Sequence, residues 1–280
     1  MSSEPRDVDA VPVAWREAGP ADAPGGQPAA VVVLLHGLGG SRISWEPQLA
    51  GPAALADRWR VAAWDLPGYG ASPALDQRPL TFPDLAGAAA GWLDALGTNS
   101  AHVVGISMGG MIAQYLAHRH PDRVRSLTLL SSSPAFGLDG TLPGDWRAAR
   151  LAPLDQGLEP ADFAERVLRG IAGPHITDDA MAGQIGAMAR ITADGLRRSI
   201  DVLVTHDTRP ILAEITAPTL CLVGALDEET PVAYSRYLAS HLPHGTLEVV
   251  PDAGHLLNVE APDAVNQLIR HHLETVEASE

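Results

Sequence analysis

The segment from Ala101 to His118 constrains the fold more than any other part of the sequence. It reads AHVVGISMGGMIAQYLAH, in which a short apolar run ends at GISMG, residues 105–109, and passes directly into apolar residues at helical spacing. A Gly-x-Ser-x-Gly turn between a strand and a helix holds its serine on a sharply bent backbone, and the small residues around it let strand and helix approach closely. The segment therefore predicts a strand, a tight turn and a helix, with Ser107 exposed at the turn.

The backbone around this serine predicts a site that stabilises an anion. Because Ser107 and Met108 begin the helix, their N–H groups have no intrahelical partner, and the positive end of the helix dipole points toward the turn. A glycine-rich turn, HGLGG at residues 36–40, follows the aliphatic run 30–35. Its glycines allow the N–H of Leu38 to join that of Met108 as a second oxyanion donor. The same turn also suits a simple tight connection after a buried strand.

A serine nucleophile needs a base within hydrogen-bond reach and an acid that orients the base. GALD, residues 224–227, follows one apolar strand pattern, and DAGH, residues 252–255, follows the next. Since the carboxyl ends of parallel strands meet at one edge of a sheet, Asp227 and His255 are expected beside Ser107. Glu228 and Glu229 adjoin Asp227 and are the alternative acids. The other ten histidines are placed less well, mostly near helix ends, in the inserted segment or at a strand start.

Two further reactive side chains are predicted to be structural. Asp65 precedes the serine in the chain, in the turn DLPGYG, where its carboxylate is expected to cap N–H groups of its own turn. Cys221 is the single cysteine and lies in the apolar run TLCLV, so an internal disulfide is excluded and a buried strand thiol is expected.

The rest of the sequence shows alternating strand and helix patterns, which predict one α/β domain with a single inserted segment. Residues 1–10 are expected to be a loose tail, and 11–16 an edge strand. Strands are then expected at 30–35, 61–64, 124–130, 219–223 and 246–250, and helices at 45–56, 81–96, 209–215, 232–242 and 262–275. Between residues 134 and 206 four amphipathic helical patterns follow one another without a strand, at 146–151, 160–171, 178–188 and 194–204. The predicted architecture is a mostly parallel, doubly wound sheet formed by residues 1–133 and 207–280, with residues 134–206 inserted as a helical lid.

Composition removes several function classes. The formal charge of −15 opposes binding to nucleic acid or to an anionic membrane, and no basic cluster offsets it. All 19 basic residues are arginine, so the lysine chemistry of Schiff bases, pyridoxal phosphate attachment and Walker-type phosphate binding is excluded. No apolar stretch approaches the roughly 18 residues of a membrane span, and the first residues contain no apolar leader core. A cytoplasmic protein acting on small molecules is expected.

Five motifs in order resemble the α/β-hydrolase superfamily over nearly the full chain: HGLGG, DLPGYGAS, GISMGG, LVGALDEETP and DAGHLLNVEAPD. Within it, GISMGGMIAQYLAHRHPDRV and GHLLNVE are most similar to 3-oxoadipate enol-lactonases and related small bacterial esterases. The resemblance implies a triad of Ser107, Asp227 and His255, with Leu38 and Met108 as oxyanion donors. The chain departs from ring-fission carbon–carbon hydrolases, because leucine follows His255 where those enzymes often carry tryptophan, and the inserted segment matches no motif for a particular substrate.

The expected function is hydrolysis of a small carboxylic ester or lactone through an acyl-enzyme, without a metal or an organic cofactor. Two alternatives stay open. One is carbon–carbon bond hydrolysis or another natural-product reaction on the same fold, and the other is a receptor-like protein that binds a ligand with slow or no turnover. The sequence leaves the physiological substrate and the oligomeric state undefined.

Residues of the predicted lid are candidates for substrate contacts. Trp146 and Met188 are the leading candidates, with Met181 and Leu196 beside them, although apolar residues at this spacing also suit packing within the lid. A modest pocket is expected to favour short or cyclic acyl groups over long lipid chains. If the substrate carries a carboxylate, an arginine must offset the acidic field, and five candidates lie in the segment: Arg147, Arg150, Arg190, Arg197 and Arg198. Most of the five are expected to be solvated.

Overall fold

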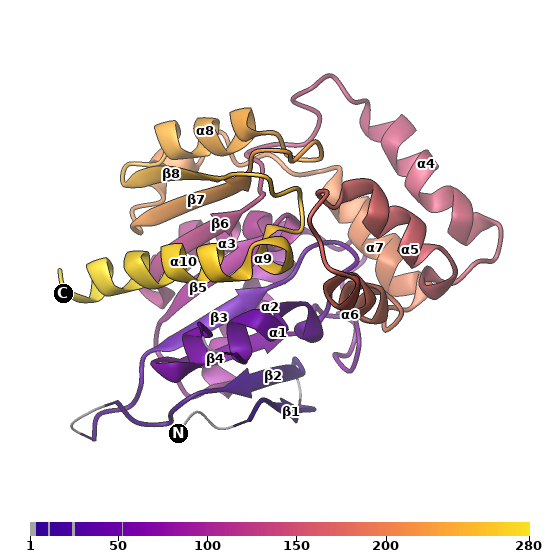
Figure 1. Ribbon diagram of the computed structural model, residues 1–280. Helices are drawn as coiled ribbons and strands as arrows, with labels where there is room; N and C mark the ends of the chain where they lie inside the picture. Colours follow the sequence, from indigo (N-terminus) through magenta and orange to yellow (C-terminus); the bar gives the residue numbers. More distant parts are fainter. Residues whose placement is uncertain (1–3, 11, 24–25, 52) are drawn as a thin grey trace.

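The computed structural model describes residues 4–10, 12–23, 26–51 and 53–280. Its described strands form one eight-stranded sheet in the order β1-β2-β4-β3-β5-β6-β7-β8 (Figure 1). The first two pairings, β1 with β2 and β2 with β4, are antiparallel, and the remaining neighbours are parallel. The strands are β1 (Arg6–Val8), β2 (Trp15–Ala18), β3 (Val31–Leu35), β4 (Arg60–Trp64), β5 (Ala101–Ile106), β6 (Val124–Leu130), β7 (Thr219–Gly224) and β8 (Gly245–Val250).

Helices cover both faces of this sheet, as the doubly wound prediction requires. The described α-helices are α1 (Glu46–Leu49), α2 (Phe82–Ala95), α3 (Met108–Arg119), α4 (Pro143–Asp155), α5 (Pro160–Ile171), α6 (Asp178–Met188), α7 (Ala193–Leu203), α8 (Val232–His241), α9 (Leu257–Glu260) and α10 (Pro262–Glu277).

Strand β3 shows why two layers form. Successive side chains of a strand point to opposite faces, and all five residues of β3 are buried. Val31, Val33 and Leu35 belong to the core shared with α2, α3 and α8, whereas Val32 and Leu34 belong to the core shared with α1 and α10. An unbroken aliphatic run of this kind is stable only when both faces of the sheet are covered.

Four helices, α4 to α7, lie between β6 and β7 in the chain and group together at one end of the sheet (Figure 1). The two ends of this inserted segment are joined by backbone hydrogen bonds. The N–H of Phe136 donates to the carbonyl of His206 at 2.9 Å, and that of Thr208 donates to the carbonyl of Pro134 at 2.8 Å. The segment is therefore closed at its base, while its function as a lid and the domain limits at residues 134 and 206 stay predictions.

Three expectations about local structure are wrong. The expected helix over 45–56 is short, because Ala50 is extended (φ −139°, ψ 152°) and ends α1 after one turn. The expected helix over 209–215 is only a 3-10 turn, Leu212–Glu214. The expected tail contains strand β1, and the expected edge strand lies later, at β2, with a neighbour on each side. Residue 11, the start of that expected strand, lies outside the described residues.

Among the described helices, none is both long enough and apolar enough to cross a membrane. The prediction of a cytoplasmic location stays untested.

Candidate active site

Ser107 lies on a strained turn between β5 and α3. Its backbone adopts φ 53° and ψ −120°, which a residue other than glycine rarely adopts. The turn is held by its neighbours: the N–H of Ser107 donates to the carbonyl of Leu130 at 2.8 Å, and the Ser107 carbonyl accepts from the Ser132 hydroxyl at 3.0 Å. The fold thus holds the serine at the carboxyl end of the central strand, as the GISMG motif predicts.

The strained turn requires glycine where α3 begins. A Cβ on Gly109 would lie 2.0 Å from the carbonyl oxygen of Leu35, and one on Gly105 would lie 2.4 Å from the carbonyl oxygen of Gly109. Both contacts are to backbone atoms, which have no flexible side chain to move aside. The close approach of β3, β5 and α3 therefore depends on these two positions.

We expect Gly109→Ala to destabilise the protein and to disrupt the turn, because overpacking against backbone costs about 1–3 kcal/mol or more. Thermal unfolding of the purified variant should show the loss as a lower Tm. Gly91→Ala in α2 is the matched control, since nothing lies within 4 Å of its added Cβ, and alanine there should be neutral or slightly stabilising. Equal Tm values for the two variants would contradict the role assigned to the close approach.

Asp227 and His255 come from the ends of β7 and β8 and are joined by a hydrogen-bonded ion pair. The Nδ1 of His255 lies 3.1 Å from Oδ1 and 3.0 Å from Oδ2 of Asp227, and both side chains are buried. Burial by itself would lower the pKa of His255, but the charge of Asp227 and its hydrogen bond raise the pKa above 6.5, with smaller contributions from Glu229 and Glu260. Burial would raise the pKa of Asp227, but His255 and N–H donors hold it below its ordinary value.

Thr230 is a site residue that the sequence reasoning missed. Its hydroxyl donates to Oδ2 of Asp227 at 2.8 Å, and its N–H donates to Oδ1 at 2.9 Å, where the N–H of Glu229 also donates at 3.0 Å. These bonds fix the carboxylate that faces His255. The sequence signals only the turn, because an aspartate side chain typically accepts from the N–H two residues further on, here that of Glu229.

Glu260 and helix α5 hold the loop that carries His255. The carboxylate of Glu260 accepts from the N–H of Gly254 at 2.6 Å and from the N–H of Leu256 at 2.9 Å, the residues on either side of the histidine. The N–H of His255 itself donates to the carbonyl of Ile171, the last residue of α5, at 3.1 Å. The inserted segment is thereby connected directly to the histidine backbone.

The backbone N–H groups of the two expected oxyanion donors, Leu38 and Met108, are unpaired among the described residues. The turn before Leu38 is fixed by His36, whose Nε2 accepts from the N–H of Leu66 at 3.0 Å and whose Nδ1 lies 2.9 Å from the carbonyl of Gly37. Burial lowers the pKa of His36, so the ring is neutral and can accept that hydrogen bond.

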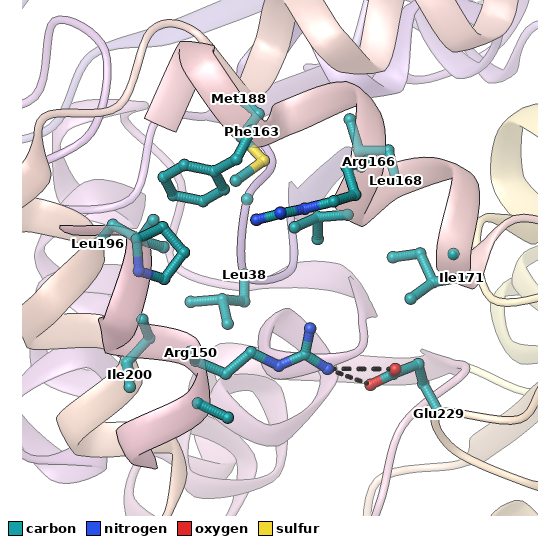
Figure 2. Close-up of a pocket in the computed structure, with 15 residues that line it drawn as sticks. Leu38, Arg150, Phe163, Arg166, Leu168, Ile171, Met188, Leu196, Ile200 and Glu229 are labelled. Carbon is teal, nitrogen blue, oxygen red and sulfur yellow. Dashed lines mark hydrogen bonds and ion pairs between the residues drawn. The ribbon is translucent and has the colours of Figure 1, made fainter. Parts of the chain in front are cut away.

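Ser107 and His255 line one cavity of about 280 Å³, and a second cavity of about 370 Å³ adjoins it. A small recess of about 40 Å³ beside both residues extends toward the glycine-rich turn. Of the predicted substrate contacts, Trp146 lines the first cavity, whereas Met188 and Leu196 line the second (Figure 2). Met181 lines neither and packs in the core instead. We refer to the two larger spaces as the serine cavity and the second cavity.

Of the five candidate arginines, Arg150 alone lines the cavities. Arg150 lines both cavities, and its Nη2 lies 3.2 and 3.3 Å from the two carboxylate oxygens of Glu229. The other four pair elsewhere and line neither cavity, with partners Asp201 for Arg147, Asp65 for Arg190, Asp155 for Arg197 and the Gln77 carbonyl for Arg198.

Two predicted structural residues are buried where expected. Asp65 is fully buried, and its carboxylate accepts from the N–H of Ala71 at 3.1 Å in its own turn and from the N–H of Arg42 at 2.9 Å. Cys221 is buried in β7, and burial raises the pKa of its thiol to about 12, which keeps it protonated and unreactive. Across the described residues, no group of three or more His, Cys, Asp or Glu side chains is placed to hold a metal ion.

A family profile described as "Alpha/beta hydrolase family" matches residues 32–268. The chain therefore belongs to the alpha/beta hydrolase family. The predicted family, the predicted α/β-hydrolase fold and the prediction that the protein is a hydrolase are confirmed.

Two groups of curated relatives are similar over most of their length. The pimeloyl-[acyl-carrier protein] methyl ester esterase of Chromobacterium violaceum is 34% identical over 87% of this chain and 94% of its own. The 3-oxoadipate enol-lactonase 2 of Acinetobacter baylyi is 30% identical over 85% of this chain and 86% of its own. Among solved structures, the enol-lactonase from Burkholderia xenovorans LB400 superposes with a TM-score of 0.79 at 25% identity, covering 96% of this chain and all of that one.

Proposed function

We propose that the protein is a serine hydrolase that cleaves a small carboxylic ester or a lactone. The observation that carries the proposal is the arrangement in one cavity of a serine on a strained turn and a histidine paired with a buried aspartate. The three side chains come from loops after three parallel strands, and a serine, a histidine and an aspartate are the groups that nucleophilic catalysis by serine uses. The relatives named a methyl ester esterase and an enol-lactonase support the same bond type, since a lactone is a cyclic ester.

In the proposed reaction the Ser107 oxygen attacks the carbonyl carbon while Nε2 of His255 takes the hydroxyl proton. The C=O electron pair moves to the oxygen, and the N–H groups of Leu38 and Met108 stabilise that oxyanion. The oxyanion then collapses, the ester C–O bond breaks, and the histidine returns its proton to the departing oxygen. Water repeats the sequence on the acyl-enzyme and releases the acid. In a lactone the departing hydroxyl stays attached to the acyl group.

Asp227 acts through the histidine. It binds the Nδ1 side of the ring, so the proton sits there and Nε2 is available as the base. Its charge also stabilises the imidazolium that forms when Ser107 is deprotonated. Because Thr230 and the N–H of Glu229 hold the carboxylate, this orientation is fixed before substrate binds.

The cavities favour compact substrates. Both have modest volumes, about 280 and 370 Å³, and Leu38, Val167 and Ile171 line both of them. Walls of this kind bury a short or cyclic acyl group by the hydrophobic effect.

We expect kcat/KM for a neutral ester to fall as the pH is lowered through the pKa of His255. Only the neutral imidazole can accept the serine proton, and Asp227 holds the pKa of His255 above 6.5, so the acidic limb should lie above that pH. Asp227→Asn removes the negative charge and should move the limb to lower pH. A pH–rate profile of the two proteins measures both positions. An acidic limb that does not move in the variant would show that another group controls it.

Burst kinetics with a p-nitrophenyl ester of a short acid tests the proposal against a receptor-like protein. A serine hydrolase releases nitrophenol repeatedly, after an initial acylation phase of up to one equivalent. Release that stops near one equivalent of enzyme would overturn the hydrolase proposal, and so would the absence of release from every ester and lactone in a panel.

A further inference from the structure

We propose that the small recess beside Ser107 and His255 binds the hydrolytic water, and that Gln184 orients this water for attack on the acyl-enzyme. The inference rests on the proposed function, because an acyl-serine needs a second nucleophile before the acid can leave. It adds to that function a water site and a residue outside the triad, which belongs to helix α6 of the inserted segment.

The recess has room for a water molecule and contains both reacting groups. Its volume is about 40 Å³, and a bound water needs about 10–15 Å³. Ser107 and His255 line the recess, and the same two residues line the serine cavity. A water in the recess is therefore beside the serine that carries the acyl group and beside the base that must take the water's proton.

Two buried amide side chains give the recess unpaired acceptors. Gln184 and Asn258 line it, with 6% and 3% of their surface exposed. Their amide nitrogens share one acceptor: Nδ2 of Asn258 donates to the Ser44 carbonyl at 2.9 Å, and Nε2 of Gln184 donates to it at 3.5 Å. Within the described ranges, the two amide oxygens accept no hydrogen bond. A buried acceptor without a partner costs free energy, and a water in the recess supplies the missing donor.

The other walls of the recess leave the water few alternative partners. Besides the backbone of the turn 37–40, apolar side chains line the space: Leu38, Ile106, Leu168, Ile171 and Leu256. Among the described residues, no carboxylate or guanidinium lines it, whereas the serine cavity has both. Since no charged group competes for its protons, a water here donates to His255 and to an amide oxygen.

The water uses its two O–H groups differently. One proton passes to Nε2 of His255 as the water oxygen attacks the acyl carbon, and the C=O electron pair moves to the oxyanion. The other O–H donates to Oε1 of Gln184 and keeps its proton. When the oxyanion collapses, the C–O bond to Ser107 breaks, Nε2 returns its proton to the serine oxygen, and the acid leaves with the second O–H. Gln184 thus fixes the direction of the attacking lone pair.

The inserted segment and the core build this site together. Gln184 lies on α6, whereas Ser44 lies on the 3-10 helix Arg42–Trp45 that follows the glycine-rich turn. The bond between them joins the two parts of the chain. The water site is therefore complete only with α6 in the position that the structure shows.

Pre-steady-state kinetics with p-nitrophenyl acetate on the full-length protein separates the two half-reactions. The burst of nitrophenol measures acylation, and the slow phase measures deacylation by water. Gln184→Met keeps the length of the side chain and removes the amide oxygen, so the slow phase should fall about tenfold while the burst rate stays within about twofold. Gln156→Met is the matched control, because Gln156 is exposed and lines none of the three spaces. It should change neither phase.

Methanol gives a second measurement that does not depend on the fraction of folded enzyme. It competes with water for the acyl-enzyme, but its single O–H goes to His255 and leaves none for Gln184. The ratio of methyl acetate to acetate formed in aqueous methanol should therefore rise about tenfold in Gln184→Met. An unchanged ratio, or an equal loss in the burst and the slow phase, would overturn the water site.

Failure of the water site differs from failure of the proposed function. If an acetyl adduct forms on Ser107 and Gln184→Met releases acetate as fast as the wild type does, the hydrolase proposal stands and the water site is wrong. If intact-mass spectrometry of protein quenched during turnover shows no acetyl adduct on the serine, the proposed mechanism and the water site are both wrong.

Discussion

Replacement of Ser107 by alanine is expected to lower ester hydrolysis by about 10⁴- to 10⁶-fold and to leave the fold intact. The loss is large because the variant has no oxygen to form the acyl-enzyme, and the remaining oxyanion donors accelerate only direct attack by water. The fold survives because the hydrogen bonds at this turn, to Leu130 and Ser132, use backbone atoms of residue 107. Alanine also has a Cβ, so the backbone strain at φ 53° is unchanged.

Steady-state kinetics with a short activated ester measures the loss, and the Tm checks the fold. Ser240→Ala is the control, because this exposed serine on α8 lies away from both cavities. It should retain full activity. A Ser107→Ala protein that is folded and keeps more than about one-hundredth of wild-type activity would contradict the serine mechanism.

His255→Ala should lower ester hydrolysis as much as Ser107→Ala does, whereas Asp227→Asn should retain more activity. Triad residues act as a unit, so removing the base leaves an unactivated hydroxyl. In Asp227→Asn the ring keeps its place through the backbone of its loop, held by Glu260 and Ile171. What is lost is the charge that fixes the tautomer and stabilises the imidazolium.

Glu228→Gln is the matched control for the acid, because Glu228 is exposed and adjoins Asp227 in sequence. Its kcat/KM should stay within about threefold of wild type. A large loss of kcat/KM in Glu228→Gln, together with near wild-type kcat/KM in Asp227→Asn, would show that Glu228 rather than Asp227 is the acid of the triad. Activity in His255→Ala near that of the wild type would exclude the histidine as the base.

The positions of the candidate site residues follow from the sequence because each motif combines a chemical group with a chain reversal at the end of a strand. Ser107 directly follows β5, whereas Asp227 and His255 lie in the loops that follow β7 and β8, and parallel strands bring such ends to one edge. The structure brings Asp227 and His255 into contact and places Ser107 and His255 in one cavity. Their catalytic roles stay predictions until they are measured.

Contacts that depend on how helices pack were not predictable in the same way. Five arginines of the inserted segment are candidates from the sequence and Arg150 alone among them lines the cavities, because which helix face meets a cavity depends on how the inserted helices sit on the sheet. Glu260 was part of a recognised motif, but its two bonds around His255 depend on the fold of that loop. Strand β1 was also missed, because a three-residue strand is stabilised by its pairing with β2 rather than by its own pattern.

Labelling with a fluorophosphonate, followed by mass spectrometry of the intact protein and its peptides, tests the central claim most directly. The reagent loses fluoride when an activated serine oxygen attacks its phosphorus, so it reports the nucleophile without any assumption about substrate. The account predicts one adduct per wild-type chain, on Ser107, no adduct in Ser107→Ala and much slower labelling in His255→Ala. An adduct on another residue, or one that persists in Ser107→Ala, would contradict it.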